Sequence, residues 1–262
     1  MNRFKKYIGL WLILFLGLAA VVAIAFIDDI KIGELTLKKA PIKDYLLTEV
    51  DTATAIDSVK NLEAEADGPA ELDTTPQNFL IIGDSMTWNL ALRLAEYAEA
   101  NGHDIHTVNW DSSSTKTWGD CDTLRHFINK FNPSYVFVSL GANEIFLKDA
   151  SSRKKCVESI LAQIGDRPYV WIGPPNWKEG EGVNDMIESM CVPGSFFRTA
   201  GMKFQLRKDG IHPTEKASAL WLDSVARWIP QSAHPIVMNL PPDTLKINKF
   251  KRAQMTILKP KK

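Results

Sequence analysis

Three short segments carry side chains whose types and spacing suit nucleophilic acyl transfer. Ser85 follows the apolar run 78–82 and a glycine, which predicts a serine on a strand-to-helix turn. Asp209 and His212 stand three residues apart on another turn, so the carboxylate can hold one imidazole nitrogen while the other nitrogen faces a serine. Asn143 follows a third apolar run and can donate its side-chain amide to an oxyanion. We predict Ser85 as nucleophile, His212 as general base and Asp209 as the group that orients it.

The elements that must position these side chains alternate between strand and helix. Short connections between them predict an α/β fold with an open parallel sheet and right-handed crossovers. Ligand sites in such sheets gather at the carboxyl ends of the strands, where Ser85, the loop 112–114 and Asn143 all lie. The predicted strands are 78–82, 105–108, 135–140, 169–172 and a short last one at 202–205, and the predicted helices follow Ser85, cover 124–131 and 153–164, and run from Pro213 to Pro230.

The three blocks, taken in order, resemble the SGNH/GDSL hydrolase family. They are residues 83–86 (Gly-Asp-Ser-Met), 141–144 (Gly-Ala-Asn-Glu) and 209–212 (Asp-Gly-Ile-His). The resemblance covers residues 78–228 and implies a three-layer α/β/α sandwich with a mainly parallel, flavodoxin-like sheet. It also implies an oxyanion hole made by the N–H of Ser85 and the amide of Asn143.

One departure from the family concerns the third oxyanion donor. The family usually has a glycine in its second block, and this chain has a run of serines there, in which Ser113 aligns best and Ser114 next. A serine N–H can donate, but its side chain narrows the pocket and restricts φ, which favours a small acyl group such as acetyl. Glu144, where the family often has aspartate, is interpreted as peripheral.

Residues around the predicted site suggest what the substrate is. Asp84 lies beside the nucleophile and is predicted to contact substrate. Trp88, just after Ser85, and Trp177, on the loop after the predicted strand 169–172, are predicted to contact it too, because flat indole faces suit a sugar ring. His103 and His106 have no acidic or cysteine partner at metal-ligand spacing and are interpreted as surface residues. The sequence therefore predicts no metal and no cofactor.

The amino terminus predicts export. Residues 7–27 carry no charge after a basic start, and a helix of this length can cross a bilayer core of about 30 Å. The length favours an uncleaved anchor over residues 1–27, although the small residues 23–25 leave a cleaved signal as an alternative. The basic flank stays cytoplasmic, which places the rest of the chain outside, on the periplasmic or cell-surface side.

The remaining segments divide the chain further. Residues 28–77 are predicted to form a tether or loose collar, and residues 78–230 the catalytic domain. Residues 231–262 are predicted to be a basic, solvated tail. Contact of its seven basic residues with anionic lipid or polysaccharide is the alternative. A formal net charge of zero gives no argument for nucleic acid. The three cysteines, which spacing cannot assign to a pair, are Cys121, Cys156 and Cys191.

Three functional hypotheses follow. The leading one is an extracytoplasmic serine esterase that removes a small acyl group, with O-acetyl favoured, from a carbohydrate or envelope polymer through an acyl-Ser85 intermediate. The second is an envelope glycan O-acyltransferase with the same three residues. The third is a glycan-binding module that has lost turnover. The expected partners are an acylated carbohydrate or small ester and the membrane.

Overall fold

The computed structural model describes residues 29–32, 35–38, 71–175 and 182–259. The chain divides after residue 68 into two compact units, and the first contributes one antiparallel hairpin of β1 (Asp29–Ile32) and β2 (Leu35–Lys38). The predicted membrane segment 1–27 lies outside the described residues. Within the described ranges, no helix is both long enough and apolar enough to cross a membrane.

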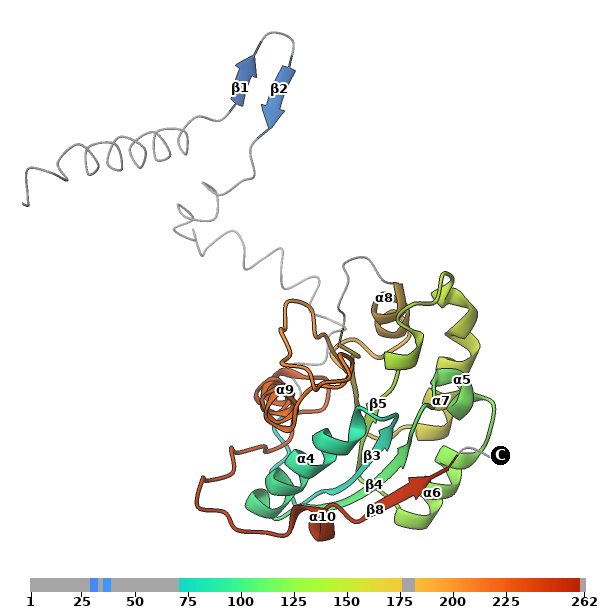
Figure 1. Cartoon of the computed structure of the whole chain (residues 1–262), viewed down its shortest axis with the longest axis vertical. Helices are drawn as coiled ribbons and strands as arrows, with labels where there is room; N and C mark the ends of the chain where they lie inside the picture. Colours follow the sequence, from blue (N-terminus) through green and yellow to red (C-terminus); the bar gives the residue numbers. More distant parts are fainter. Residues whose placement is uncertain (1–28, 33–34, 39–70, 176–181, 260–262) are drawn as a thin grey trace, which may run out of the picture. The chain divides into compact units, whose positions relative to one another are not determined.

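The second unit is built on one sheet of six parallel strands, which confirms the predicted α/β fold (Figure 1). The strand order is β7-β6-β5-β3-β4-β8, so the first five strands of this unit follow the flavodoxin-like order and β8 adds an edge beside β4. The strands are β3 (Asn78–Gly83), β4 (Asp104–Trp110), β5 (Tyr135–Ser139), β6 (Tyr169–Ile172), β7 (Phe196–Phe197) and β8 (Met255–Leu258).

Helices cover both faces of this sheet, which makes the predicted three layers. Every residue of β5 and β6 is buried, as expected for strands between two helical layers. One apolar core joins the sheet to α4 (Thr87–Asn101) and α9 (Glu215–Trp228). The other joins it to α5 (Thr115–Gly119), α6 (Thr123–Phe131), α7 (Lys154–Ile164) and α8 (Gly182–Glu188). The shorter helices are η1 (Ala142–Glu144), η2 (Ala150–Arg153), η3 (Ile229–Gln231) and α10 (Lys249–Arg252).

Gly83 allows the carboxyl end of β3 to pack closely against its neighbours. A Cβ atom at this position would lie 2.1 Å from the Ser139 carbonyl oxygen and 2.3 Å from Thr87 Oγ1. Both separations are far inside van der Waals contact, so glycine is required for the close approach of β3 to β5 and α4. The strand order reverses between β3 and β5, and this is where open α/β sheets bind ligands. The glycine thus delivers Ser85 to that point.

The strand predicted at residues 202–205 is not present. Residues 202–205 form no strand, and β7 instead occupies Phe196–Phe197, paired with β6. The two phenylalanines bury their rings, whereas Lys203 and Gln205 in the predicted strand are exposed. A run with alternate exposed polar residues cannot fill a place covered by helices on both faces.

The domain also extends beyond both predicted boundaries. Residues 231–262 were predicted to be a tail, but β8 pairs in parallel with β4 and Arg252 forms ion pairs with Glu99 and Asp104. At the other end, Asp73, predicted to lie in the tether, bridges to Ile236. The boundaries at 78 and 230 are therefore wrong, because the basic residues near the carboxyl terminus find acidic partners on α4 and β4 that charge counting alone cannot reveal.

Candidate active site

The structure brings together the three residues predicted for acyl transfer. Ser85 Oγ lies 2.8 Å from His212 Nε2, and His212 Nδ1 lies 3.0 Å from Asp209 Oδ2. Both distances are within hydrogen-bond range, although Ser85 and His212 are 127 residues apart in sequence. The three side chains form one continuous serine–histidine–carboxylate chain.

A tight turn before α9 fixes the histidine. The N–H of Gly210 donates to the Arg207 carbonyl at 3.1 Å, and Gly210 has a φ of 68°, a left-handed conformation that suits glycine. The N–H of Arg207 donates to the His212 carbonyl at 2.8 Å, which closes the base of the turn. The Thr214 side chain then caps α9. The backbone therefore places Asp209 and His212 before their side chains interact.

Asp209 is held as a carboxylate by its own turn. Its Oδ1 accepts the backbone N–H groups of His212 and Ile211, both at 2.9 Å. These two bonds, and after them the bond to the His212 side chain, lower the pKa of Asp209 to about 2. An ionised Asp209 accepts a hydrogen bond from Nδ1–H, so Nε2 is left to accept the hydroxyl proton of Ser85. This arrangement is the one that a general base requires.

Two of the predicted oxyanion donors lie on neighbouring strand ends. The Ser85 N–H makes no hydrogen bond with the described part of the chain. Asn143, on η1 after β5, is exposed, and its Nδ2 donates one hydrogen to the Ser113 carbonyl at 2.8 Å. A side-chain amide has two N–H hydrogens, so the second remains for a substrate.

Ser113 has a different part from the one predicted. Its N–H donates to the Trp110 carbonyl at 3.0 Å, and its buried hydroxyl accepts the Trp118 indole N–H at 2.9 Å. Because the Ser113 N–H already bonds within a turn, this geometry does not support the prediction of Ser113 as the third oxyanion donor. Ser112 beside it has a φ of 59°, an uncommon conformation for a residue other than glycine.

Asp84 was predicted to contact substrate, and the structure contradicts this. Its side chain is fully buried, and its Oδ1 accepts the Met86 N–H at 2.9 Å. Oδ2 has no partner of normal geometry among the described residues, and the nearby Ala142 amide offsets only part of the cost of burial. Burial raises the pKa of Asp84 to about 7, and the charge of Glu144 adds to the rise. Asp84 therefore stabilises the turn that carries Ser85 through its bond to the Met86 N–H.

The raised pKa of Asp84 predicts a pH-dependent stability. The folded protein holds this proton more tightly than the unfolded chain, so the contribution is complete below about pH 4 and is lost as pH rises toward 7. We expect the free energy of unfolding of the parent to fall more steeply over this range than that of Asp84→Asn. Urea titrations of both proteins at several pH values measure the two slopes, and parallel slopes would contradict the assignment.

Glu144, interpreted from sequence as peripheral, is buried and central. One carboxylate oxygen accepts the Thr115 N–H at 2.8 Å, and the other accepts the Thr115 hydroxyl at 2.8 Å and Arg153 Nε at 2.7 Å. The loop after β4 is thereby tied to the turn that carries Asn143. Sequence reasoning missed this residue, although an acid directly after Asn143 with an arginine nine residues later was an available signal.

The two predicted aromatic contacts have different outcomes. Trp88 is half-buried, and its indole N–H donates to Asp111 Oδ1 at 3.0 Å, which fixes the ring at the carboxyl edge of the sheet. Asp111 also accepts from Asn109 Nδ2 at 2.7 Å. Trp177 lies outside the described residues.

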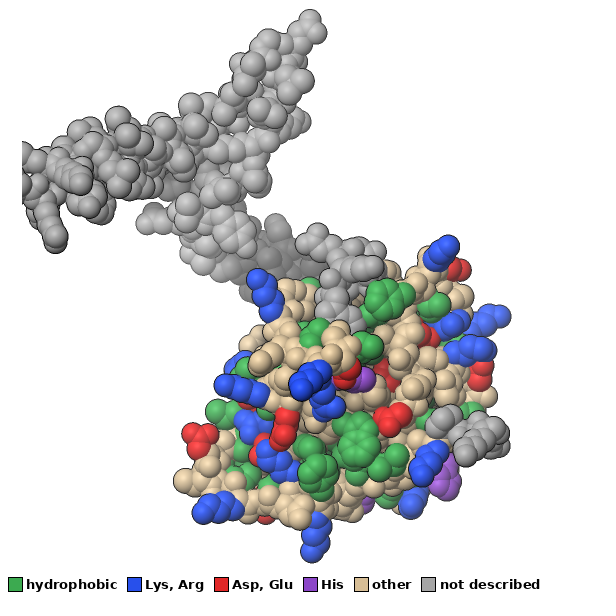
Figure 2. Space-filling model, viewed as in Figure 1, with side chains coloured by type: hydrophobic (Ala, Val, Ile, Leu, Met, Phe, Trp, Pro, Cys, Tyr) green, Lys and Arg blue, Asp and Glu red, His purple; other side chains and the backbone are tan. Residues whose placement is uncertain are grey.

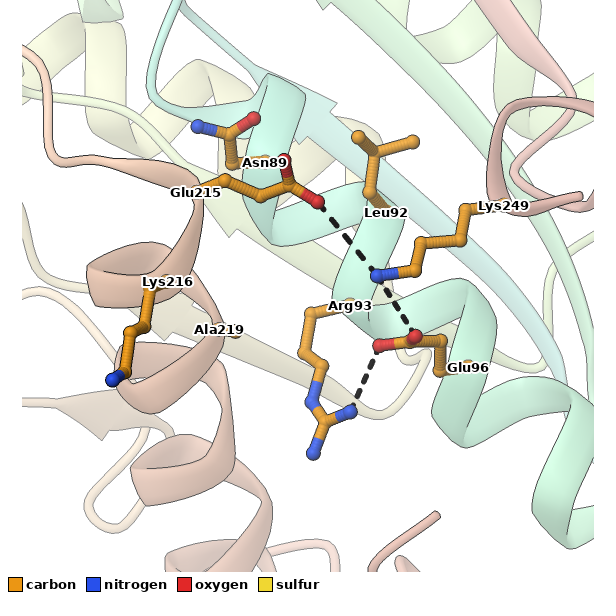
Figure 3. Close-up of a pocket in the computed structure, with 8 residues that line it drawn as sticks. All are labelled: Asn89, Leu92, Arg93, Glu96, Glu215, Lys216, Ala219 and Lys249. Atoms are coloured by element: carbon orange, nitrogen blue, oxygen red, sulfur yellow. Dashed lines mark hydrogen bonds and ion pairs between the residues drawn. The ribbon is translucent and has the colours of Figure 1, made fainter. Parts of the chain in front are cut away.

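Ion pairs join the two helices that follow Ser85 and His212 (Figure 3). Arg93 on α4 bonds to Glu96 and to Asp223 on α9, both at 2.8 Å. Lys249 reaches Glu96 at 2.9 Å and Glu215 at 3.7 Å across the hollow between the helices. Because charged residues that line the hollow pair with one another, we interpret these ion pairs as a structural link between α4 and α9 and not as a ligand site.

The other candidate residues are structural in the described regions. His103, predicted to be at the surface, is buried, and its ring nitrogens bond to the Gln77 N–H and the Val237 carbonyl. Burial lowers the pKa of His103. The three cysteines form no disulfide, and no cluster of three metal-binding side chains occurs among the described residues.

Comparison with known proteins adds no assignment. The chain matches no protein-family model and has no significant match among curated proteins. The resemblance of the three sequence blocks to the SGNH/GDSL hydrolases therefore stays a prediction, and the geometry of the site is the basis for a functional proposal.

Proposed function

We propose that this chain is a serine ester hydrolase of the SGNH/GDSL type that removes a small acyl group through an acyl-Ser85 intermediate. The observation that carries the proposal is the hydrogen-bonded chain from Ser85 through His212 to Asp209. Ser85, the first residue of this hydrogen-bonded chain, follows the carboxyl end of β3, where open α/β sheets form ligand sites. Nucleophile, base and orienting group are thus present in the geometry that acyl transfer needs.

The first half of the reaction forms the acyl-enzyme. Ser85 Oγ attacks the ester carbonyl while His212 Nε2 takes the hydroxyl proton, and Asp209 stabilises the imidazolium. The carbonyl oxygen gains negative charge, which the Ser85 N–H and the second hydrogen of Asn143 Nδ2 can stabilise. The tetrahedral intermediate collapses as His212 gives the proton to the leaving alcohol.

The second half frees the acid. His212 removes a proton from a water molecule, whose oxygen attacks the acyl carbon of the Ser85 ester, and the proton then passes to Ser85 Oγ. If a sugar hydroxyl replaced this water, the same residues would perform acyl transfer. The products of deacylation therefore distinguish a hydrolase from a transferase.

We further propose an acetylated carbohydrate as substrate, acted on outside the cytoplasm. Trp88 supports this choice, since its half-exposed ring is held at the same sheet edge by Asp111. Aromatic rings fixed in this way provide flat faces for sugars. The uncharged segment 7–27 supports an outward-facing enzyme anchored to the membrane.

The test is acetate release from p-nitrophenyl acetate and from an acetylated neutral polysaccharide by the purified full-length chain. We expect turnover in the parent and a loss of about 10⁵-fold or more in Ser85→Ala, since removal of a serine nucleophile leaves only binding and oxyanion stabilisation. Ser159→Ala, which removes a hydroxyl bonded to the Gly119 carbonyl, serves as control. Equal turnover in the parent and Ser85→Ala would overturn the proposal.

A further inference from the structure

A basic segment lies directly before the turn that carries Asp209 and His212. We name residues 203–208 the basic strap; its cations are Lys203, Arg207 and Lys208, all exposed. Figure 2 shows lysine and arginine side chains standing out over the loop between β7 and α9. The nearest acid along the chain is Asp209, whose carboxylate is already engaged by His212. With three cations and one carboxylate, residues 203–209 carry a net positive charge.

Arg207 differs from the other arginines that the structure describes. Its guanidinium makes no hydrogen bond and no ion pair with any described residue, whereas each of the others has at least one side-chain contact. Those contacts involve Arg93, Arg125, Arg153, Arg167, Arg198, Arg227 and Arg252. An arginine that the fold leaves unpaired beside the base retains its five N–H donors for a ligand.

The backbone fixes this arginine close to the reacting groups. Arg207 is the first residue of the four-residue turn that contains Asp209, and its N–H bonds to the His212 carbonyl at 2.8 Å. Such a turn keeps its first and last Cα atoms within about 7 Å. Next to the antiparallel bridge of Leu206 with Pro213, Arg207 lies opposite His212, so its backbone is adjacent to that of the general base. From this position an arginine side chain is long enough to contact a substrate group next to the ester.

We propose that Arg207, assisted by Lys203 and Lys208, binds a carboxylate carried by the substrate, so that the natural ester is an acylated anionic glycan with uronic-acid-type sugars. This inference rests on the proposed function. A planar guanidinium matches a carboxylate with two parallel hydrogen bonds, and the two lysines add attraction from a distance. A negatively charged substrate would also be drawn toward a site flanked by unpaired cations.

The experiment compares two acetylated polymers, a neutral glucomannan and a polygalacturonate, with the full-length chain at low and high salt. We expect Arg207→Gln to lower kcat/KM for the polygalacturonate by about 3- to 10-fold, with the glucomannan unchanged. High salt should reduce the preference in the parent, and Arg207→Lys should restore it in part. Lys251→Gln, which removes an exposed cation on α10 just before the edge strand β8, is the matched control.

The outcomes separate this inference from the proposed function. Turnover of both polymers with no preference, or an equal loss on both in Arg207→Gln, would overturn the inference alone. If neither polymer is hydrolysed, binding of unesterified oligogalacturonate to Ser85→Ala decides it, since Arg207→Gln in that background should weaken binding. Absence of binding would overturn it. If Arg207→Gln weakened binding of the protein to anionic phospholipid vesicles and left hydrolysis of both polymers unchanged, the inference would likewise be overturned, and the basic strap would be assigned to membrane binding.

Discussion

Asp209→Asn should lower kcat by about 10⁴-fold while the protein stays folded. The new amide side chain would keep an oxygen for the N–H groups of Ile211 and His212, so the turn survives. Its NH₂ group would instead face His212 Nδ1, which must then accept a hydrogen bond. Nε2 would carry the proton and could no longer accept one from Ser85. The measurement is kcat for p-nitrophenyl acetate together with the thermal midpoint.

The control for this prediction is Asp243→Asn, which changes an exposed aspartate in the segment after η3. It should leave kcat and the thermal midpoint unchanged. The low pKa of Asp209 adds a further expectation, because its titration near pH 2 cannot produce a change of activity above about pH 4. An Asp209→Asn protein with kcat close to that of the parent would show that His212 needs no orienting carboxylate.

Glu144→Ala is expected to be destabilising and to reduce kcat in the protein that remains folded. The change leaves the Thr115 N–H and Arg153 without the carboxylate that they share, which should cost about 3 kcal/mol of unfolding free energy. It also removes the carboxylate bonds that tie the loop after β4 to the turn of Asn143, so that, in the described part of the chain, this turn keeps only the bond from Asn143 Nδ2 to the Ser113 carbonyl of that loop. A displacement of about 1 Å in such a donor can cost about 10²-fold in rate. Urea unfolding and kcat measured below the unfolding transition test the two effects.

Two further variants separate position from stability. Glu144→Gln keeps the length and one acceptor oxygen, so its losses should fall between those of the parent and Glu144→Ala. Glu158→Ala, on the exposed face of α7, should change neither quantity. A Glu144→Ala protein that loses stability and yet keeps the parent's kcat would show that Glu144 acts on the fold alone.

The fold and the triad were accessible from sequence for related reasons. Apolar runs long enough for buried strands, separated by helical periodicity, predict a covered parallel sheet, and a glycine directly follows the predicted strands 78–82, 135–140 and 169–172. Ser85 follows one such end, and the 209–212 turn is marked by its own glycine before the last long helix. Their meeting was predicted from the order and spacing of the three sequence blocks and from the resemblance of these blocks to the SGNH/GDSL hydrolases.

The misplaced residues depend on partners that a local sequence pattern does not show. Asp84 lies next to the nucleophile, but its side chain is buried and accepts the Met86 amide. Ser113 loses its N–H to a turn with Trp110, which alignment to a glycine cannot reveal. β8 joins the sheet through a short, half-buried strand with charged neighbours, and its local pattern resembles a solvated tail.

The central claim is that Ser85 is the nucleophile activated by His212. The most direct measurement is phosphonylation by a fluorophosphonate ester, followed by mass spectrometry of the intact chain and of its peptides. We expect one adduct, located on Ser85, which forms much more slowly in His212→Ala and is absent in Ser85→Ala. A parent protein that hydrolyses esters with Ser85 unmodified, or an adduct that persists in Ser85→Ala, would contradict the claim.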